Sequence, residues 1–219
     1  IALCVFNVNA NAQGCVAIRS TGSSCSIEKP GASYNWQINA NYRYFKSFRH
    51  FRGKEEQKER LVQHTDVRNY QHSLDLSIVR KLNNRWSLSL NIPLLFNMRS
   101  SLYEHGRTER HFTSSTGLGD MRLSAYYWAI DPKKLSKGNI QLGMGIKFAT
   151  GDYNYTDYWY NVGPNGAPEL RTVDQSIQLG DGGTGLATEL NGYYSFTSKF
   201  SAYGNVFYLF NPRDVNGTR

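Results

Sequence analysis

Alternation of apolar and polar side chains is the main pattern along the chain. The clearest window runs from 86 to 96, where even positions are apolar and odd positions are mostly polar. Windows with the same period of two cover 34–44, 73–78, 120–129, 140–149, 186–196 and 199–211. A period of two is typical of β-strands whose two faces meet different surroundings. The sequence therefore predicts an all-β chain with about seven visible strands.

The connections between these windows alternate between short and long. Short turns are expected near Asn83-Asn84, over 131–138 and near Thr197-Ser198, since Asn tolerates the positive φ of tight hairpins. Long connections are expected over 51–69, 99–116 and 152–183. Short turns at one end and long loops at the other are typical of outer-membrane barrels. The pattern therefore favours an antiparallel up-and-down transmembrane β-barrel, incomplete in this chain.

Strand length and polar-face charges agree with this interpretation. A strand from Trp86 to Phe96 rises roughly 33 Å, and a tilt of about 45° leaves roughly 23 Å of height, close to the ~25 Å apolar band of such barrels. Aromatic residues stand at both ends of this apolar face. The polar faces carry charges of both signs, which we expect to line or brace a wet lumen; they are Arg43, Asp75, Arg122, Lys147 and Glu189.

Composition narrows the class of protein. Hydrophobic residues make up 40% of the chain and the mean hydropathy is −0.53. No segment approaches the roughly 18–20 consecutive apolar residues of a membrane helix, so a helical membrane protein is excluded. A soluble β-sandwich also alternates, but the mixed-charge polar faces and the alternating loop lengths weigh against it.

The net charge of +8 suggests attraction to anionic lipopolysaccharide as well as to outer-membrane lipid. Nucleic acid is not an expected partner, because no motif gathers the basic residues.

The N-terminal segment resembles an export signal. Residues 1–12 end in Ala10-Asn11-Ala12, a cleavage pattern, and are interpreted as a signal-peptide remnant. Residues 13–30 would form a periplasmic segment and 31–219 a partial barrel. Seven strands are an odd number and 215–219 resembles the start of a loop, so we expect truncation at both ends.

Two cysteines would remain after cleavage of the signal. Cys15 and Cys25 could form one disulfide in an oxidising periplasm; two free thiols are the alternative. Lipidation of Cys15 is disfavoured because Gln13 is a poor residue before Gly14.

Motifs that would indicate chemistry are weak. Residues 180–185 match G-x-G-x-x-G, but a strand pattern follows where a dinucleotide site needs a helix. Residues 152–157 lack the Gly and Glu of a calcium loop, and the five histidines show no metal-ligand spacing. No G-x-S-x-G is present. We therefore expect no enzyme, no cofactor and no metal.

The long segment 152–183 is rich in aromatic residues. They are Tyr153, Tyr155, Tyr158, Trp159 and Tyr160. Three interpretations stay open, namely a packed outer loop, a stacking surface for sugars or apolar ligands, and a loop that folds into the pore. The mixed-charge run at 51–63 is interpreted as a solvated loop.

Several short motifs resemble a known family. Thr116-Gly-Leu-Gly-Asp120, the strand ending in Ala149-Thr-Gly-Asp152, and Thr184-Gly-Leu186 resemble outer-membrane transporter-like proteins grouped with the meta-pathway of phenol degradation. The signal end also resembles exported proteins of Bacteroidetes. This resemblance implies passive uptake of small, often hydrophobic compounds and supplies no catalytic residues. The expected function is an outer-membrane channel or passive transporter; the alternative is a non-transporting surface barrel acting in ligand binding, adhesion or complex assembly.

Overall fold

The computed structural model describes residues 35–134 and 137–212. The expected signal remnant, the periplasmic segment and the Cys15–Cys25 pair lie outside these residues. Long strands dominate the described part: β1 (Trp36–Ser47), β4 (Arg68–Lys81), β5 (Trp86–Ser101), β6 (His111–Leu118), β7 (Arg122–Trp128), β8 (Gly138–Lys147), β11 (Gly185–Ser195) and β12 (Ser201–Phe210).

These strands form one antiparallel sheet in the order β1-β4-β5-β7-β8-β11-β12, and β6 also pairs with β5. β6 pairs with residues 94–101 of β5, and β7 pairs with residues 86–91. β6 and β7 therefore lie end to end and together fill one strand position beside β5. The result is an up-and-down sheet of seven strand positions, as the alternation predicts.

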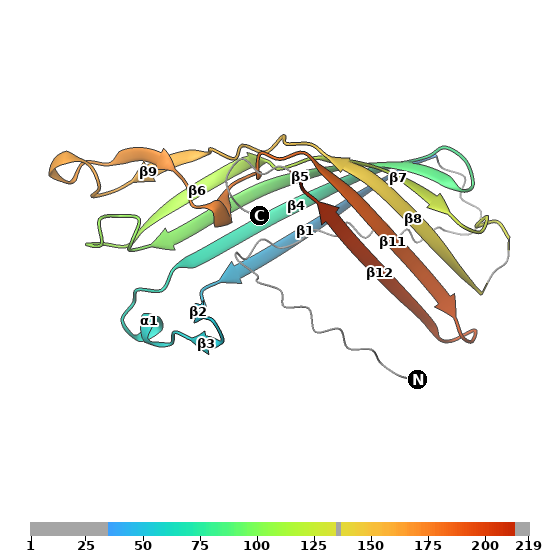
Figure 1. Ribbon diagram of the computed structural model, residues 1–219, viewed down its shortest axis with the longest axis horizontal. Coiled ribbons are helices and arrows are strands. Elements are labelled where there is room, and N and C mark those ends of the chain that lie inside the picture. Colours follow the sequence, from blue (N-terminus) through green and yellow to red (C-terminus); the bar gives the residue numbers. More distant parts are fainter. Residues whose placement is uncertain (1–34, 135–136, 213–219) are drawn as a thin grey trace.

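The sheet curls into a half-barrel (Figure 1). Side chains of β7 and β12 meet across the two strands between them, since the guanidinium of Arg122 lies 4.7 Å from the ring centre of Phe207. The face that carries these two residues is called the concave face below. The opposite, convex face carries most of the exposed apolar residues of the sheet.

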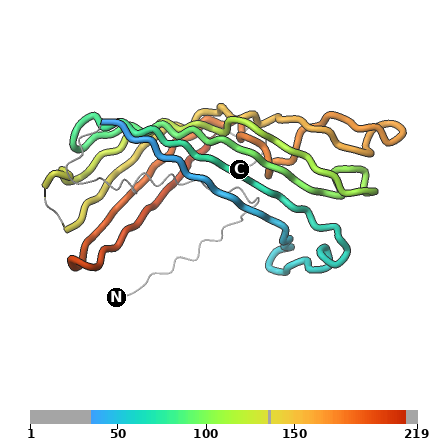
Figure 2. The backbone as a smooth tube through the Cα atoms, turned by 180° about the vertical axis from the view of Figure 1, so that it is seen from behind, coloured from blue at the N-terminus to red at the C-terminus, as the bar shows by residue number. Residues whose placement is uncertain are grey.

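Short turns and long loops gather at opposite ends of the sheet (Figures 1 and 2). The short-turn end comprises residues 80–86, 129–134, 137 and 196–200. The long-loop end comprises 48–67, 102–110 and 148–184. Its smaller elements are β2 (Phe51–Arg52), β3 (Glu55–Glu56), α1 (Glu59–Val62), β9 (Thr156–Trp159), η1 (Pro164–Gly166), β10 (Glu169–Thr172) and η2 (Gln175–Ile177). Among the described residues, no helix is long and apolar enough to span a membrane.

Two expected boundaries are wrong. The connection expected over 99–116 shrinks to 102–110, because β5 continues to Ser101 and β6 begins at His111. The interior of β6 places Ser114 and Thr116 on its exposed face and Thr113 and Ser115 on its buried face. Because both faces are polar, this strand gives no alternation signal. The loop expected over 152–183 contains the β9–β10 hairpin.

Candidate functional site: the concave face

The two faces of the sheet have the reverse of the usual distribution. Large apolar residues are exposed on the convex face, including Ile38 at 72%, Met144 at 70% and Val206 at 64%. Polar residues are buried on the concave face, including Ser89, Asn97 and Asn191. Within the described strands, charged residues on the convex face occur only near the strand ends, at Lys46, Arg68 and Arg80. The interior of this sheet is therefore its polar side.

The five charged residues expected to line a lumen all lie on the concave face. These five side chains have separate partners along this face. Arg43 of β1 faces Asp75 of β4 at 3.9 Å. Arg122 donates a 3.1 Å hydrogen bond to the side-chain oxygen of Asn91. Lys147 and Glu189 each belong to a separate polar network.

Hydrogen bonds join Glu189 of β11 to side chains of β7 and β12. The Tyr126 hydroxyl donates to one carboxylate oxygen at 2.9 Å, and the Asn205 amide donates to the other at 3.0 Å. Gly143 of β8 lies between Tyr126 and Glu189, and a Cβ there would be 2.6 Å from the Tyr126 ring and 3.2 Å from the Glu189 Cβ. The missing side chain at Gly143 therefore allows the Tyr126–Glu189 contact.

Lys147 lies between two carboxylates where three chain segments meet. Its ammonium group is 3.3 Å from Asp120, between β6 and β7, and also contacts Asp181, just before β11. The side chains of Lys147 and Asp120 are only 8% and 13% exposed. The Asn211 amide donates to the second oxygen of Asp181 at 2.7 Å. One buried cation thus joins two acidic turns.

Glycines allow the close approach of these turns. A Cβ at Gly151 would be 2.4 Å from the Leu179 carbonyl oxygen, and one at Gly180 would be 2.6 Å from the Asp120 carboxylate. The Gly151 amide also donates to Asp120 at 2.9 Å. The glycine-rich motifs at 116–120, 149–152 and 180–185 therefore pack against one another. A strand, β11, follows 180–185 as expected.

An inward segment, residues 173–181, covers part of the concave face. Its apolar side chains Val173, Ile177 and Leu179 are 2%, 0% and 6% exposed. The Ile177 carbonyl accepts hydrogen bonds from Asn97 and Ser115. In Figure 1 the short orange helix of this segment lies beneath the arch of β5 and β6.

Besides Ser115 of β6, polar side chains of β4 and β5 fix the inward segment to the sheet. Gln71 of β4 donates to the Ser176 carbonyl at 2.6 Å. Arg99 of β5 donates to the Ser176 hydroxyl at 3.1 Å and pairs with Asp174 at 3.2 Å. The alternation of apolar and polar positions does not mark Gln71, Arg99 or Asp174 as site residues. The available signal was the set of apolar positions at 173, 177 and 179 within the otherwise polar and glycine-rich stretch 171–183.

The aromatic residues of 152–183 do not form one surface. Tyr158 lies in β9 opposite Leu170 of β10, and both are exposed, at 52% and 59%. Tyr160 stacks on His111 with ring centres 4.7 Å apart. Tyr153, Tyr155 and Trp159 are half-buried. Only Tyr158, with Leu170, forms an exposed apolar pair on the hairpin.

Loop 102–110 contains two buried titratable residues. Burial raises the pKa of Glu104, although Arg99 pairs with it at 2.5 Å. Burial, together with nearby His111, lowers the pKa of His105. The Nδ1 atom of His105 accepts the Tyr160 amide at 3.0 Å. This loop is therefore tied to the β9–β10 hairpin through a neutral imidazole.

The fold and the reversed faces define the chain as a curled antiparallel half-barrel with a polar interior. Comparison with known proteins adds nothing to this class, since no protein-family model and no curated protein sequence matches the chain. Within the described ranges, no group of three or more His, Cys, Asp or Glu residues is placed to hold a metal ion.

Proposed function

We propose that this chain is part of a passive channel for small molecules in the bacterial outer membrane, and that it is not an enzyme. The reversed distribution of apolar and polar residues supports the proposal best. In water, a contiguous exposed apolar patch larger than a few hundred Å² is unfavourable and marks a binding or membrane surface. In a bilayer, side chains such as Ile38, Met144 and Val206 would contact acyl chains.

The concave face supports the transport part of the proposal. Most of its buried side chains are hydroxyls, amides and charged groups that can solvate a water-filled path, as in the lumen of outer-membrane barrels. Arg43, Asp75, Arg122, Lys147 and Glu189 would tune the selectivity of this path. The resemblance to transporter-like proteins of phenol degradation suggests small, often hydrophobic solutes.

The inward segment would restrict the path. Residues 173–181 reach the concave face of β4, β5 and β6, and a loop in this place narrows a barrel from within. Arg99 and Asp174 would then lie at the narrow part and act on charged solutes. Solute size and charge should therefore both influence flux.

Conductance of the full-length protein in a planar bilayer tests the proposal. We expect single-channel steps, and we expect larger steps when 173–181 is replaced by a Gly-Ser linker. A matched control replaces 161–166, at the tip of the β9–β10 hairpin, with the same kind of linker and should leave the step size unchanged. Protein that inserts into the bilayer and passes neither ions nor small solutes would overturn the channel proposal.

The hairpin favours a second candidate function, capture of a ligand or partner at the cell surface. The exposed Tyr158 and Leu170 form an apolar pair beyond the end of the sheet. A double variant, Tyr158→Ser with Leu170→Ser, should abolish surface binding and leave flux unchanged if this function holds. Loss of flux with intact binding would contradict it.

A further inference from the structure

Basic residues are concentrated at the short-turn end. Its three turns carry a single acidic residue, Asp131. In addition to Lys81, the basic residues of these turns are Arg80, Arg85, Lys133, Lys134, Lys137 and Lys199. The long-loop end has eight basic and eleven acidic residues. The positive charge of the chain therefore lies at the end opposite to the long loops.

Six of these basic residues, all but Lys81, form no close ion pair with a carboxylate of the described ranges 35–134 and 137–212. The Asp131 carboxylate accepts hydrogen bonds from the Lys133 backbone amide at 3.0 Å and from the Asn84 side chain at 3.3 Å. It thus stabilises its own turn.

The long-loop end differs because its carboxylates outnumber its cations and several of these cations form ion pairs. Arg49 pairs with Glu56 at 2.6 Å, and Arg171 pairs with Glu169 at 2.5 Å. The buried Asp66 carboxylate binds both Arg68 and Arg110. The local carboxylates already neutralise these cations, so they are poor sites for an external anion.

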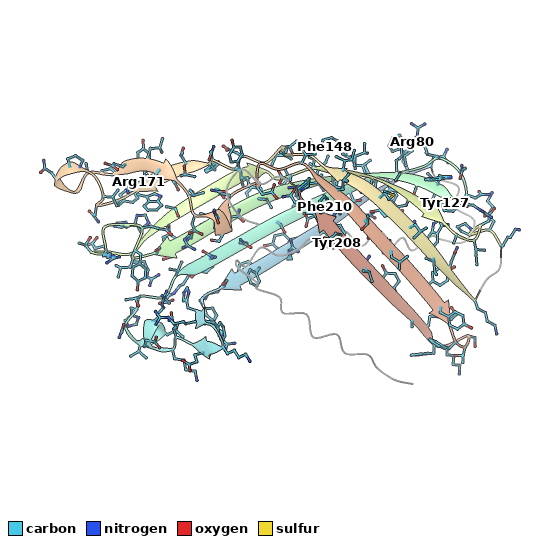
Figure 3. All side chains as sticks on the ribbon, in the orientation of Figure 1. Arg80, Tyr127, Phe148, Arg171, Tyr208 and Phe210 are labelled. Carbon is cyan, nitrogen blue, oxygen red and sulfur yellow. The ribbon has the colours of Figure 1, made fainter. Side chains whose placement is uncertain are left out.

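Aromatic residues join the basic residues to the convex face. The Arg80 guanidinium lies 5.1 Å from the ring centre of Trp36, and the Arg85 guanidinium donates to the Tyr127 hydroxyl at 2.9 Å. Trp86 packs on Tyr127 with ring centres 4.9 Å apart. Trp36 and Trp86 are 58% and 45% exposed at the edge of the apolar face. Figure 3 shows Arg80 and Tyr127 together at this end, with Arg171 at the opposite end.

From this arrangement we infer that the short-turn end binds the headgroups of anionic phospholipids. The inference rests on the proposed membrane location. Trp and Tyr sit at the headgroup level of a bilayer, so the attached guanidinium groups lie at the height of the lipid phosphates. Each basic residue near an anionic membrane surface adds about 1 kcal/mol of attraction. The occupant is a lipid headgroup and not a free phosphate, because the cations border an apolar surface that acyl chains would cover.

Spin-labelled lipids test the inference with the full chain in phosphatidylcholine vesicles. The motionally restricted spectral component reports lipid in contact with the protein. We expect labelled phosphatidylglycerol to be preferred over labelled phosphatidylcholine by about fivefold, the factor that corresponds to ~1 kcal/mol for one basic residue. The preference should fall as salt is raised, because salt screens exposed charges.

Two charge-matched variants locate the binding surface. Substituting Arg80, Arg85 and Lys133 with Gln should remove most of the preference, whereas substituting Arg52, Lys54 and Lys58 with Gln should preserve it. The reverse result, or equal preference for the two lipids in the unsubstituted chain, would overturn the inference. A restricted component without lipid preference would leave the membrane proposal standing, whereas absence of any restricted component would overturn both.

Discussion

The backbone amide of Tyr160 donates a 3.0 Å hydrogen bond to Nδ1 of His105. This atom can accept only while it carries no proton, so the contact between loop 102–110 and the β9–β10 hairpin requires a neutral His105 ring. Protonation of Nδ1 would turn this acceptor into a donor. Two N–H groups would then face each other, and the hydrogen bond would be lost. The facing His111 would oppose the added charge, and Asp157 would partly favour it.

Acidification should release this contact. Burial lowers the pKa of His105, so the free loop takes up a proton more readily than the docked loop as the pH falls below about 6.5. The stability from this contact is therefore present above that pH and is lost as the pH falls through the lowered pKa. Hydrogen exchange should show a protected Tyr160 amide at pH 8 and a weakly protected one at pH 5, after correction for intrinsic rates.

The variant His105→Asn is the control for this prediction. The amide oxygen of Asn can stand where Nδ1 stands and does not titrate, so the protection of Tyr160 should no longer depend on pH. Equal protection at both pH values in the unsubstituted chain would contradict the assigned role of His105.

Removal of the buried ammonium group of Lys147 should strongly destabilise the chain. Lys147→Met leaves Asp120 and Asp181 near each other without a cation, and breaking a buried ion pair from one side costs about 3–5 kcal/mol. Urea unfolding of the detergent-folded chain measures the loss. Arg171→Met removes an exposed partner and should cost no more than about 1 kcal/mol; similar losses in both variants would refute the bracing role of Lys147.

The glycine at 143 should not tolerate a larger residue. Gly143→Val would push against the Tyr126 ring and disturb its hydrogen bond to Glu189, and overpacking of this kind costs about 1–3 kcal/mol. Gly204 of β12 has nothing within 4 Å of a Cβ position, so Gly204→Val should fold as well as the unsubstituted chain. Comparison of the two unfolding midpoints checks the prediction, which fails if the midpoints agree.

Introducing a charged residue on the convex face tests whether lipid or water surrounds this face of the sheet. Met144 lies in the middle of this face and is 70% exposed. Met144→Arg should cost about 2–4 kcal/mol if the residue faces the centre of a bilayer, but should be nearly neutral in water. Ser198→Arg, at an exposed position of the short-turn end, is the control. Folding yield into vesicles should fall only for Met144→Arg, and unchanged yield would count against the membrane location.

The sequence predicts the sheet better than the site. The alternation around Leu90 and Leu142 locates β5 and β8, because one side of each strand is apolar along its whole length. β6 is hidden because Ser114 and Thr116 make its exposed face polar. Docking of Ile177 onto Asn97 and Ser115 depends on curvature and on contacts distant in sequence, which a local pattern does not contain. The grouping of Lys147 with Asp120 and Asp181 was missed for the same reason.

The inward segment makes no strand pairing with the sheet it covers. Side chains such as Gln71 and Arg99 hold it, and its backbone amides at Val173 and Leu179 donate to the carbonyls of Tyr155 and Asp152, outside the sheet. Displacing residues 173–179 would uncover the buried side chains of Val173, Ile177 and Leu179, but it would break no strand pairing of the half-barrel. The width of the interior therefore depends on a docked segment as well as on the wall of strands.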